Sequence, residues 1–228
     1  VGYTLVYGII GMINFAHGEV YMISAYLTAI VLASLAAMGV TAVPLAILFT
    51  LIITILFTTL HGWVIERVAY RPLRGSTRLA PLLSPIGMSL VLQNYVQVAQ
   101  GARNKGIPTL IEGHLRFGDA SGYVQITYIQ VLIVVVSIIG MGVLTWVIQK
   151  TELGRACRAT QQDRGMAELL GIDTDRTISI TFVLGAAMAA VAGTLVTLNY
   201  GSFDFYIGFV TGIKAFTAAV LGGIGSLP

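Results

Sequence analysis

The feature that most constrains the fold is where charged residues are absent. The chain has 13 basic and 10 acidic residues, yet none of them lies in residues 20–65, 120–149 or 177–203. An apolar stretch of about 20 residues is long enough to cross a bilayer core as a helix. Charged residues make up 10% of the chain, whereas soluble domains carry about 25%. The sequence therefore predicts an all-α, polytopic helical membrane protein.

The apolar segments predict a series of membrane spans. Gly39 and Pro44 bound a turn between two of them, because proline is favoured at the first turn of a helix. The first apolar run is too short for a bilayer core at about 1.5 Å per residue, so we expect a fragment that lacks both ends of a longer protein. The predicted spans are 1–13 (partial), 20–38, 43–65, 79–100, 128–149, 178–198 and 206–227.

The basic residues are divided unevenly between the two ends of these spans. Nine of them lie in the segments 66–78 and 150–176, and three lie in the segment 101–127. Cytoplasmic loops of membrane proteins carry the excess of Lys and Arg. We therefore expect 66–78 and 150–176 to be cytosolic, and 101–127 to lie on the opposite side of the membrane.

The segment 150–176 is the most highly charged part of the chain, with five bases and five acids. Thr151 is placed to cap a first short helix, and Gly171 follows the apolar residues of a second one. Cys157, the single cysteine, is expected to be a small buried helix residue, and one cysteine excludes an internal disulfide. Short amphipathic helices that project from a membrane domain predict a docking surface for another protein.

Residues 14–19 interrupt two apolar runs and allow two interpretations. One is a solvated turn at the membrane surface, and the other is a broken or re-entrant segment whose polar groups line a cavity. Lys214, the one base inside a predicted span, either reaches the bilayer surface, pairs with Asp204 or marks the same polar path. The candidate residues of a translocation path are Asn14, Phe15, His17, Gly18, Glu19 and Lys214.

Small residues recur every fourth position in the predicted span 178–198, which indicates close helix packing. These residues are Gly185, Ala189 and Gly193. Gly222 and Gly223 resemble a phosphate-binding loop only superficially, because no lysine follows them, so a tight bend or a helix contact is the better interpretation. The sequence shows no metal-ligand spacing and no catalytic constellation, so we predict neither a metal site nor an enzyme. A net charge of +3 does not indicate a nucleic-acid partner.

Four motifs closely resemble one transporter family: YGIIGMINFAHGEVYM, ERVAYRPLRGS, LGRACRATQQDRGMAELLGIDTDR and KAFTAAVLGGIGSLP. They occur in the same order as in the H-type (LivH-like) permease of bacterial branched-chain amino acid ABC importers, and the resemblance covers essentially the whole chain. It implies an ABC importer permease domain of the bacterial inner membrane that moves leucine, isoleucine and valine by alternating access. It also implies that 101–127 is periplasmic and that the subunit itself needs no cofactor.

The resemblance implies partners as well: a second (M-type) permease subunit, two cytosolic ATP-binding subunits and a periplasmic amino-acid-binding protein. It makes 150–176 the coupling loop toward the ATPase. The general permease motif E-A-A-x-x-x-G is half kept, because Ala167 and Gly171 match it while Gly165 and Met166 replace its first two residues. The predicted coupling residues are Gly154, Arg155, Arg158, Asp163, Ala167, Glu168, Gly171 and Asp173.

Two alternatives stay open at this point. A permease for ribose-type sugars or short amides would share the fold and the loop. A secondary transporter that works without ATP would need ionisable pairs inside the membrane, for which only Lys214 and Glu19 are available.

Overall fold

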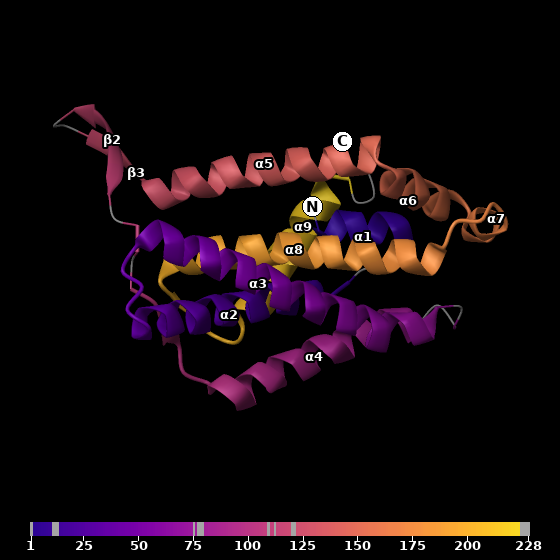
Figure 1. Cartoon of the computed structure of the whole chain (residues 1–228), viewed down its shortest axis with the longest axis horizontal. Coiled ribbons are helices and arrows are strands. Elements are labelled where there is room, and N and C mark those ends of the chain that lie inside the picture. Colours follow the sequence, from indigo (N-terminus) through magenta and orange to yellow (C-terminus); the bar gives the residue numbers. More distant parts are fainter. Residues whose placement is uncertain are drawn as a thin grey trace.

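The structure is a computed structural model, and it describes residues 2–10, 14–74, 76, 80–108, 110–111, 113–119 and 122–223. Long helices run side by side along the longest axis of the molecule, as Figure 1 shows. The α-helices are α1 (Gly2–Ile10), α2 (His17–Ala37), α3 (Val43–Ile65), α4 (Ala80–Gln100), α5 (Tyr128–Lys150), α6 (Glu152–Gln162), α7 (Arg164–Leu169), α8 (Thr174–Tyr200) and α9 (Ile207–Leu221).

Among the described residues, four short strands lie in the connections between helices. β2 (His114–Asp119) and β3 (Gly122–Thr127) form an antiparallel hairpin in which His114 pairs with Thr127. β1 (Lys105–Gly106) and β4 (Ser202–Phe203) form a second, two-residue antiparallel pair. The predicted loop 101–127 therefore contains regular backbone pairing, although helices dominate the described residues.

α8 is the helix around which the others pack, and it runs along both α2 and α3. Its small residues allow the close approach, since a Cβ atom at Gly193 would collide with the Ser24 hydroxyl of α2. The Ser24 hydroxyl donates to the Ala189 carbonyl at 3.2 Å. Gly185 faces Val6 of α1 and the start of α2. The stripe of small residues thus lies where α8 meets α1 and α2.

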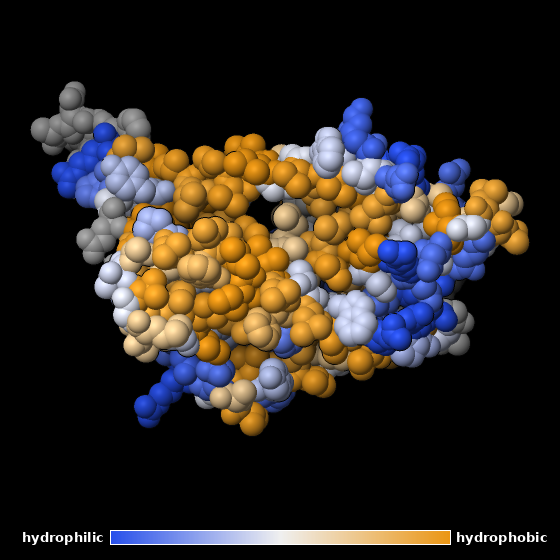
Figure 2. All heavy atoms as spheres, viewed as in Figure 1, coloured by the Kyte–Doolittle hydropathy of each residue, from blue (hydrophilic) through white to orange (hydrophobic). Residues whose placement is uncertain are grey.

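α5 is the most exposed of the long helices. Its outer face carries large apolar side chains, among them Ile138, Ile139 and Trp146, and Figure 2 shows an apolar surface over much of the middle of the molecule. Soluble proteins rarely expose apolar patches of this extent. Four described helical segments are long and apolar enough to cross a membrane: His17–Ala37, Val43–Leu73, Tyr128–Lys150 and Thr174–Tyr200.

The charged segments predicted to share one side lie at one end of the molecule. α6 and α7 are at the same end as the chain that follows α3, whereas the β2–β3 hairpin and the α2–α3 connection are at the opposite end (Figure 1). This arrangement agrees with the division of basic residues on which the predicted orientation rests.

Two predicted segments differ in the structure. The segment 66–78 does not begin as a loop, because α3 continues into a π-helical turn, η1 (Glu66–Tyr70), and a 3₁₀ turn, η2 (Arg71–Leu73). The expected span 206–227 is represented by α9, which ends at Leu221 and is shorter than a bilayer core at about 1.5 Å per residue. α1 lies within the run 1–13, which the sequence predicts as a partial span. Of the predicted spans and the segment 66–78, residues 1, 11–13, 75, 77–79 and 224–227 lie outside the described residues.

Candidate functional site

The segment between α1 and α2 lies in the protein interior. The Asn14 side chain is 3% exposed and accepts a hydrogen bond from the Tyr70 hydroxyl at 2.7 Å. Glu19, in the first turn of α2, is 1% exposed. The solvated-turn interpretation is therefore wrong for both residues, and their burial agrees with the alternative of a polar break inside the helix bundle.

The Glu19 carboxylate is held by two neutral donors of α4. Ser89 Oγ donates to Glu19 Oε1 at 2.9 Å, and Gln93 Nε2 donates to the same oxygen at 3.1 Å. The second oxygen, Oε2, is buried and has no hydrogen-bond partner among the described residues, and no basic side chain in this part of the chain forms an ion pair with Glu19. A buried carboxylate costs free energy unless it is paired, so an incompletely paired one indicates a functional role.

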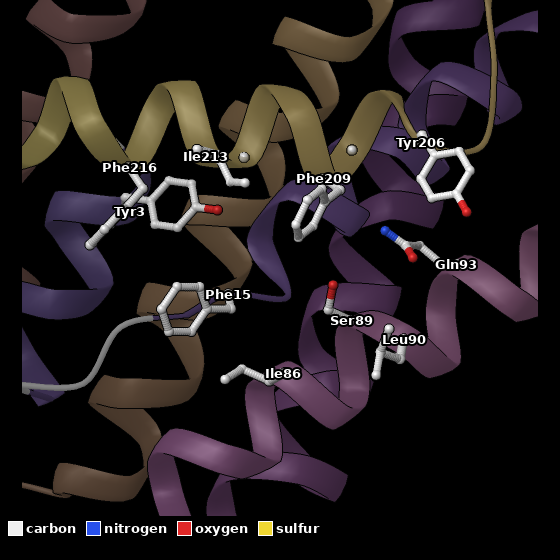
Figure 3. Close-up of a pocket in the computed structure, with 12 residues that line it drawn as sticks. Tyr3, Phe15, Ile86, Ser89, Leu90, Gln93, Tyr206, Phe209, Ile213 and Phe216 are labelled. Atoms are coloured by element: carbon white, nitrogen blue, oxygen red, sulfur yellow. The ribbon is translucent and has the colours of Figure 1, made fainter.

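Ser89 and Gln93 also form part of the wall of a cavity of about 330 Å³, which we call the polar cavity. Ligand sites typically enclose about 300–1,000 Å³, with an apolar lining and a few convergent polar groups. The cavity lies between α4 and α9, and Tyr3 of α1 and Phe15, in the connection between α1 and α2, complete it (Figure 3). Its lining residues are Tyr3, Phe15, Ile86, Ser89, Leu90, Gln93, Tyr206, Gly208, Phe209, Gly212, Ile213 and Phe216.

Aromatic side chains form one part of this wall. The ring of Phe15 lies 5.8 Å from that of Phe216, and the ring of Tyr3 lies 6.4 Å from the same residue. In Figure 3 the Ser89 hydroxyl points from α4 toward α9. The polar cavity therefore combines an apolar, aromatic surface with the two residues that bind Glu19.

Glycines bring Glu19 close to the cavity. A Cβ atom at Gly18 would collide with the Gly208 carbonyl, which shows how closely α9 approaches α2. A Cβ atom at Gly208 would lie 2.6 Å from Glu19 Oε2. Because Gly208 lines the cavity, Glu19 Oε2 lies close to a residue of the cavity wall.

Two larger hollows have a different character. One of about 610 Å³ lies near β1 and the end of α4, and one of about 540 Å³ lies between α5, α8 and α9. Their walls are mainly apolar, and neither is lined by Ser89 or Gln93. The polar cavity is therefore the stronger candidate for a site that recognises a polar ligand.

Among the remaining path candidates, His17 and Gly18 line the hollow between α5, α8 and α9. His17 packs its ring against Tyr3, with the ring centroids 4.8 Å apart, and lies beside Gly185 of α8. Lys214 is exposed on α9, does not line the polar cavity and forms no ion pair with Asp204 or another described acid. Gly222 and Gly223 end α9. Within the described ranges, no group of His, Cys, Asp or Glu side chains is arranged to hold a metal ion.

The segment 150–176 folds into α6 and α7 with defined caps. The Thr151 hydroxyl accepts from the Gly154 amide at 3.3 Å, so Thr151 caps α6 as predicted. A Cβ atom at Gly154 would collide with the Ile148 carbonyl, so the sharp turn from α5 requires glycine. Arg158 donates to that same carbonyl. The α5–α6 junction is therefore held by both backbone and side-chain contacts.

α7 presents apolar side chains to the outside. The Asp163 carboxylate accepts from the Met166 amide at 2.9 Å and caps the helix. Ala167 is buried, whereas Leu169 is 82% exposed and Leu170 is 74% exposed. Gly171 follows with a φ of +84°, a conformation that glycine adopts without strain. Two neighbouring exposed leucines on an ordered helix indicate a surface for a partner.

A group of ion pairs connects α7 to the ends of α3 and α8. Asp175, in the first turn of α8, pairs with Arg71 at 3.2 Å, with Arg164 at 3.1 Å, and with Arg74. Arg74 also pairs with Glu66, whose second oxygen accepts from Ser179 of α8 at 2.7 Å. We call this group the ion-pair cluster; its members are Glu66, Arg71, Arg74, Arg164, Glu168 and Asp175.

Glu168 joins the cluster from α7. Its carboxylate accepts from the Thr174 hydroxyl at 2.6 Å and pairs with Arg164 at 3.1 Å. The Thr174 hydrogen bond, followed by the Arg164 contacts, lowers the pKa of Glu168 below its ordinary value. The other loop residues differ: Arg155 is exposed and pairs with Glu152 at 3.6 Å, and Asp173 caps α8 by accepting from the Arg176 amide.

Cys157 is buried between α6 and α8, where its thiol lies 3.7 Å from the Thr181 hydroxyl. Burial raises the pKa of the Cys157 thiol. Only the thiolate is strongly nucleophilic, so this environment agrees with the predicted structural role.

Sequence reasoning missed the residues that complete both regions. Ser89 and Gln93 are four positions apart and therefore share one face of α4. That spacing of polar residues in an apolar helix was an available signal. The sequence predicts only that the basic segment 66–78 is cytosolic, whereas in the structure Glu66 is 0% exposed and its charge is neutralised by Arg74.

Comparison with known proteins places these observations in a family. All residues 1–228 match the family described as the permease component of a branched-chain amino acid transport system. The high-affinity branched-chain amino acid transport system permease protein BraD of Pseudomonas aeruginosa is 55% identical over 100% of this chain and 75% of its own length. The corresponding protein LivH of Escherichia coli is 52% identical over 100% of this chain and 74% of its own length. No solved structure matches the chain.

Proposed function

Because the chain belongs to the family of permease components of branched-chain amino acid transport systems, we propose that it forms one membrane-spanning subunit of an ATP-driven importer for leucine, isoleucine and valine. The observation that carries the proposal is the family match over the whole chain. The partners are a second permease subunit, two cytosolic ATP-binding subunits and a periplasmic amino-acid-binding protein. The importer lies in the bacterial inner membrane.

The substrate passes the polar cavity between α4 and α9. Its apolar and aromatic lining suits a branched alkyl side chain, and its polar residues suit the backbone end of an amino acid. Alternating access requires that the helices around this cavity take up two arrangements.

The ATPase subunits dock on α7. Leu169 and Leu170 supply the exposed apolar contact, and the mixed charges around them give specificity more than affinity. Closure of the ATPase dimer moves α7, and the ion-pair cluster carries that movement to α3 and α8. α8 packs on α1, α2 and α3, so its displacement reaches the elements that border the polar cavity.

The docking step is tested with the full-length protein expressed together with its partner subunits. In the variant Leu169→Ser with Leu170→Ser, the second permease subunit is expected to copurify while the ATPase subunits are lost. Met38→Ser is the matched control, because Met38 is 70% exposed but lies at the connection between α2 and α3, at the other end of the molecule. Normal ATPase binding by the double variant would contradict docking on α7.

The substrate is tested by ATP-dependent uptake of labelled L-leucine into proteoliposomes that contain the complete transporter. Unlabelled isoleucine and valine are expected to compete, and ribose and urea are not. Competition by ribose or urea, or uptake that continues without ATP, would contradict the proposed function.

A further inference from the structure

The two oxygens of Glu19 have different surroundings. Oε1 accepts hydrogen bonds from both Ser89 and Gln93, whereas Oε2 has no partner among the described residues although it is buried. Both donors are neutral, so the carboxylate has no counter-charge within this part of the chain. A cationic group is what this arrangement lacks.

The polar cavity is chemically suited to supply that group from a ligand. None of its lining residues is charged, so the field of the nearby Glu19 carboxylate dominates it, and this field favours a positively charged ligand group. Gly208 leaves Glu19 Oε2 next to the cavity wall. A side chain at this position of α9 would collide with that oxygen.

We propose that the polar cavity binds the primary ammonium group of the transported amino acid, with Glu19 as its counter-charge. A primary ammonium has three donors and no acceptor. Ser89 and Gln93 line the cavity and donate to Glu19 Oε1, and their hydroxyl and amide oxygens can also accept hydrogen bonds. This inference rests on the proposed function and adds the group by which the permease itself recognises its substrate.

The same cavity provides a place for the alkyl side chain. Phe15, Ile213 and Phe216 form an apolar surface on one part of the cavity wall, and Ser89 and Gln93 lie on another part (Figure 3). A bare metal ion fits less well, because calcium requires about six to eight oxygen ligands. An alkylammonium ion matches both the acceptors and the apolar wall.

The test uses the complete transporter in lipid nanodiscs, without the binding protein and without nucleotide. Two probes divide leucine into its parts: 3-methylbutylamine keeps the ammonium group, and 4-methylpentanoate keeps the carboxylate. The amine is expected to bind and to raise the thermal stability of the complex, whereas the acid is not. In Glu19→Gln the dissociation constant of the amine is expected to rise roughly 30-fold or more, as for loss of a buried charge partner.

Ser89→Ala keeps the charge of Glu19 and removes one donor, so a smaller loss of amine affinity is expected. Glu152→Gln is the matched control, because it neutralises a carboxylate that is 95% exposed on α6. Equal binding of the amine by wild type and Glu19→Gln would overturn the inference, as would preferential binding of 4-methylpentanoate. Leucine uptake by the wild-type transporter tests the proposed function separately, because it is measured without reference to Glu19.

Discussion

Two buried glutamates show how differently this fold treats the same side chain. Glu66 is 0% exposed and Glu19 is 1% exposed. Glu66 pairs with Arg74 through one oxygen and accepts from Ser179 through the other. Glu19 has neutral donors on one oxygen and no partner on the second among the described residues. The two carboxylates are therefore equally buried, but both oxygens of Glu66 have partners and only one oxygen of Glu19 does among the described residues.

The difference indicates two roles. A buried carboxylate with a cationic partner and both oxygens satisfied fixes the elements that contribute those groups, and the ion-pair cluster joins α3, α7 and α8 in this way. A buried carboxylate without a counter-charge is costly, so it persists where a ligand completes it. The ion-pair cluster is a structural connection, and the polar cavity is a binding site.

The largest expected effect is on the ion-pair cluster. Glu66→Ala removes the fully buried partner of Arg74 and leaves this largely buried arginine only the more exposed Asp175, and breaking a buried ion pair costs about 3–5 kcal/mol. Thermal unfolding of the purified complex in nanodiscs measures the loss. Glu152→Ala, on the exposed surface of α6, is the control and should change stability little. If the Glu66→Ala complex were as stable as wild type, the ion-pair cluster would not have the proposed structural role.

The next effect concerns the close contact between α2, which carries Glu19, and α8, which carries Asp175 of the ion-pair cluster. Gly193→Ala places a methyl group against the Ser24 hydroxyl, and overpacking of this kind costs about 1–3 kcal/mol. Gly142→Ala is the matched control on α5, where nothing lies within 4 Å of the added atom. The control should be neutral or slightly stabilising, because alanine favours helix. If both variants unfold at the same temperature, the close packing of α2 and α8 is not required.

A smaller effect is expected at the cap of α7. Asp163→Ala removes the acceptor for the Met166 amide, and loss of such a cap costs about 1 kcal/mol. Faster hydrogen exchange of the α7 amides and weaker coupling of ATP hydrolysis to transport should follow. Asp163→Asn should behave almost as wild type, since asparagine is an equally good cap. Loss of coupling in Asp163→Asn as well would show that the charge, not the cap, is required.

The smallest effect is a dependence on pH. Thr174 and Arg164 lower the pKa of Glu168 in the folded protein. The ionised Glu168 therefore contributes its full stabilisation of the folded state above the ordinary pKa of about 4.3. This stabilisation is lost as the pH falls through the lowered pKa of the folded protein. Proteolysis of the α6–α7 segment should therefore increase in that acidic range. In Glu168→Gln the α6–α7 segment should be less protected from proteolysis, and this protection should no longer change with pH in the acidic range. An unchanged pH profile in Glu168→Gln would assign the effect to another group.

Local sequence signals predicted the helical part of this architecture well. The apolar run and Pro44 predicted a helix over 43–65, and α3 covers Val43–Ile65. Thr151 caps α6, and Gly171 follows α7 in the left-handed conformation. These features depend on residues a few positions apart, which a sequence displays directly.

The pairing of the buried acids could not be predicted in the same way. Ser89 is 70 positions from Glu19, and Ser179 is 113 positions from Glu66. The sequence places Glu66 in a basic cytosolic segment but does not show that Arg74 pairs with it in the protein interior. Only the packing of α4 on α2 and of α8 on the end of α3 distinguishes the incompletely paired acid from the paired one.

The most direct test of this account is a parallel measurement on Glu19→Gln and Glu66→Gln in the complete reconstituted transporter. Thermal stability and ATP-dependent L-leucine uptake are recorded for both variants. We predict that Glu19→Gln keeps or gains stability, since it removes an uncompensated buried charge, but loses uptake. We predict that Glu66→Gln loses stability, because Arg74 loses its buried anionic partner and keeps only the more exposed Asp175. Normal leucine uptake by a stable Glu19→Gln transporter would contradict the assignment of the polar cavity as the substrate site.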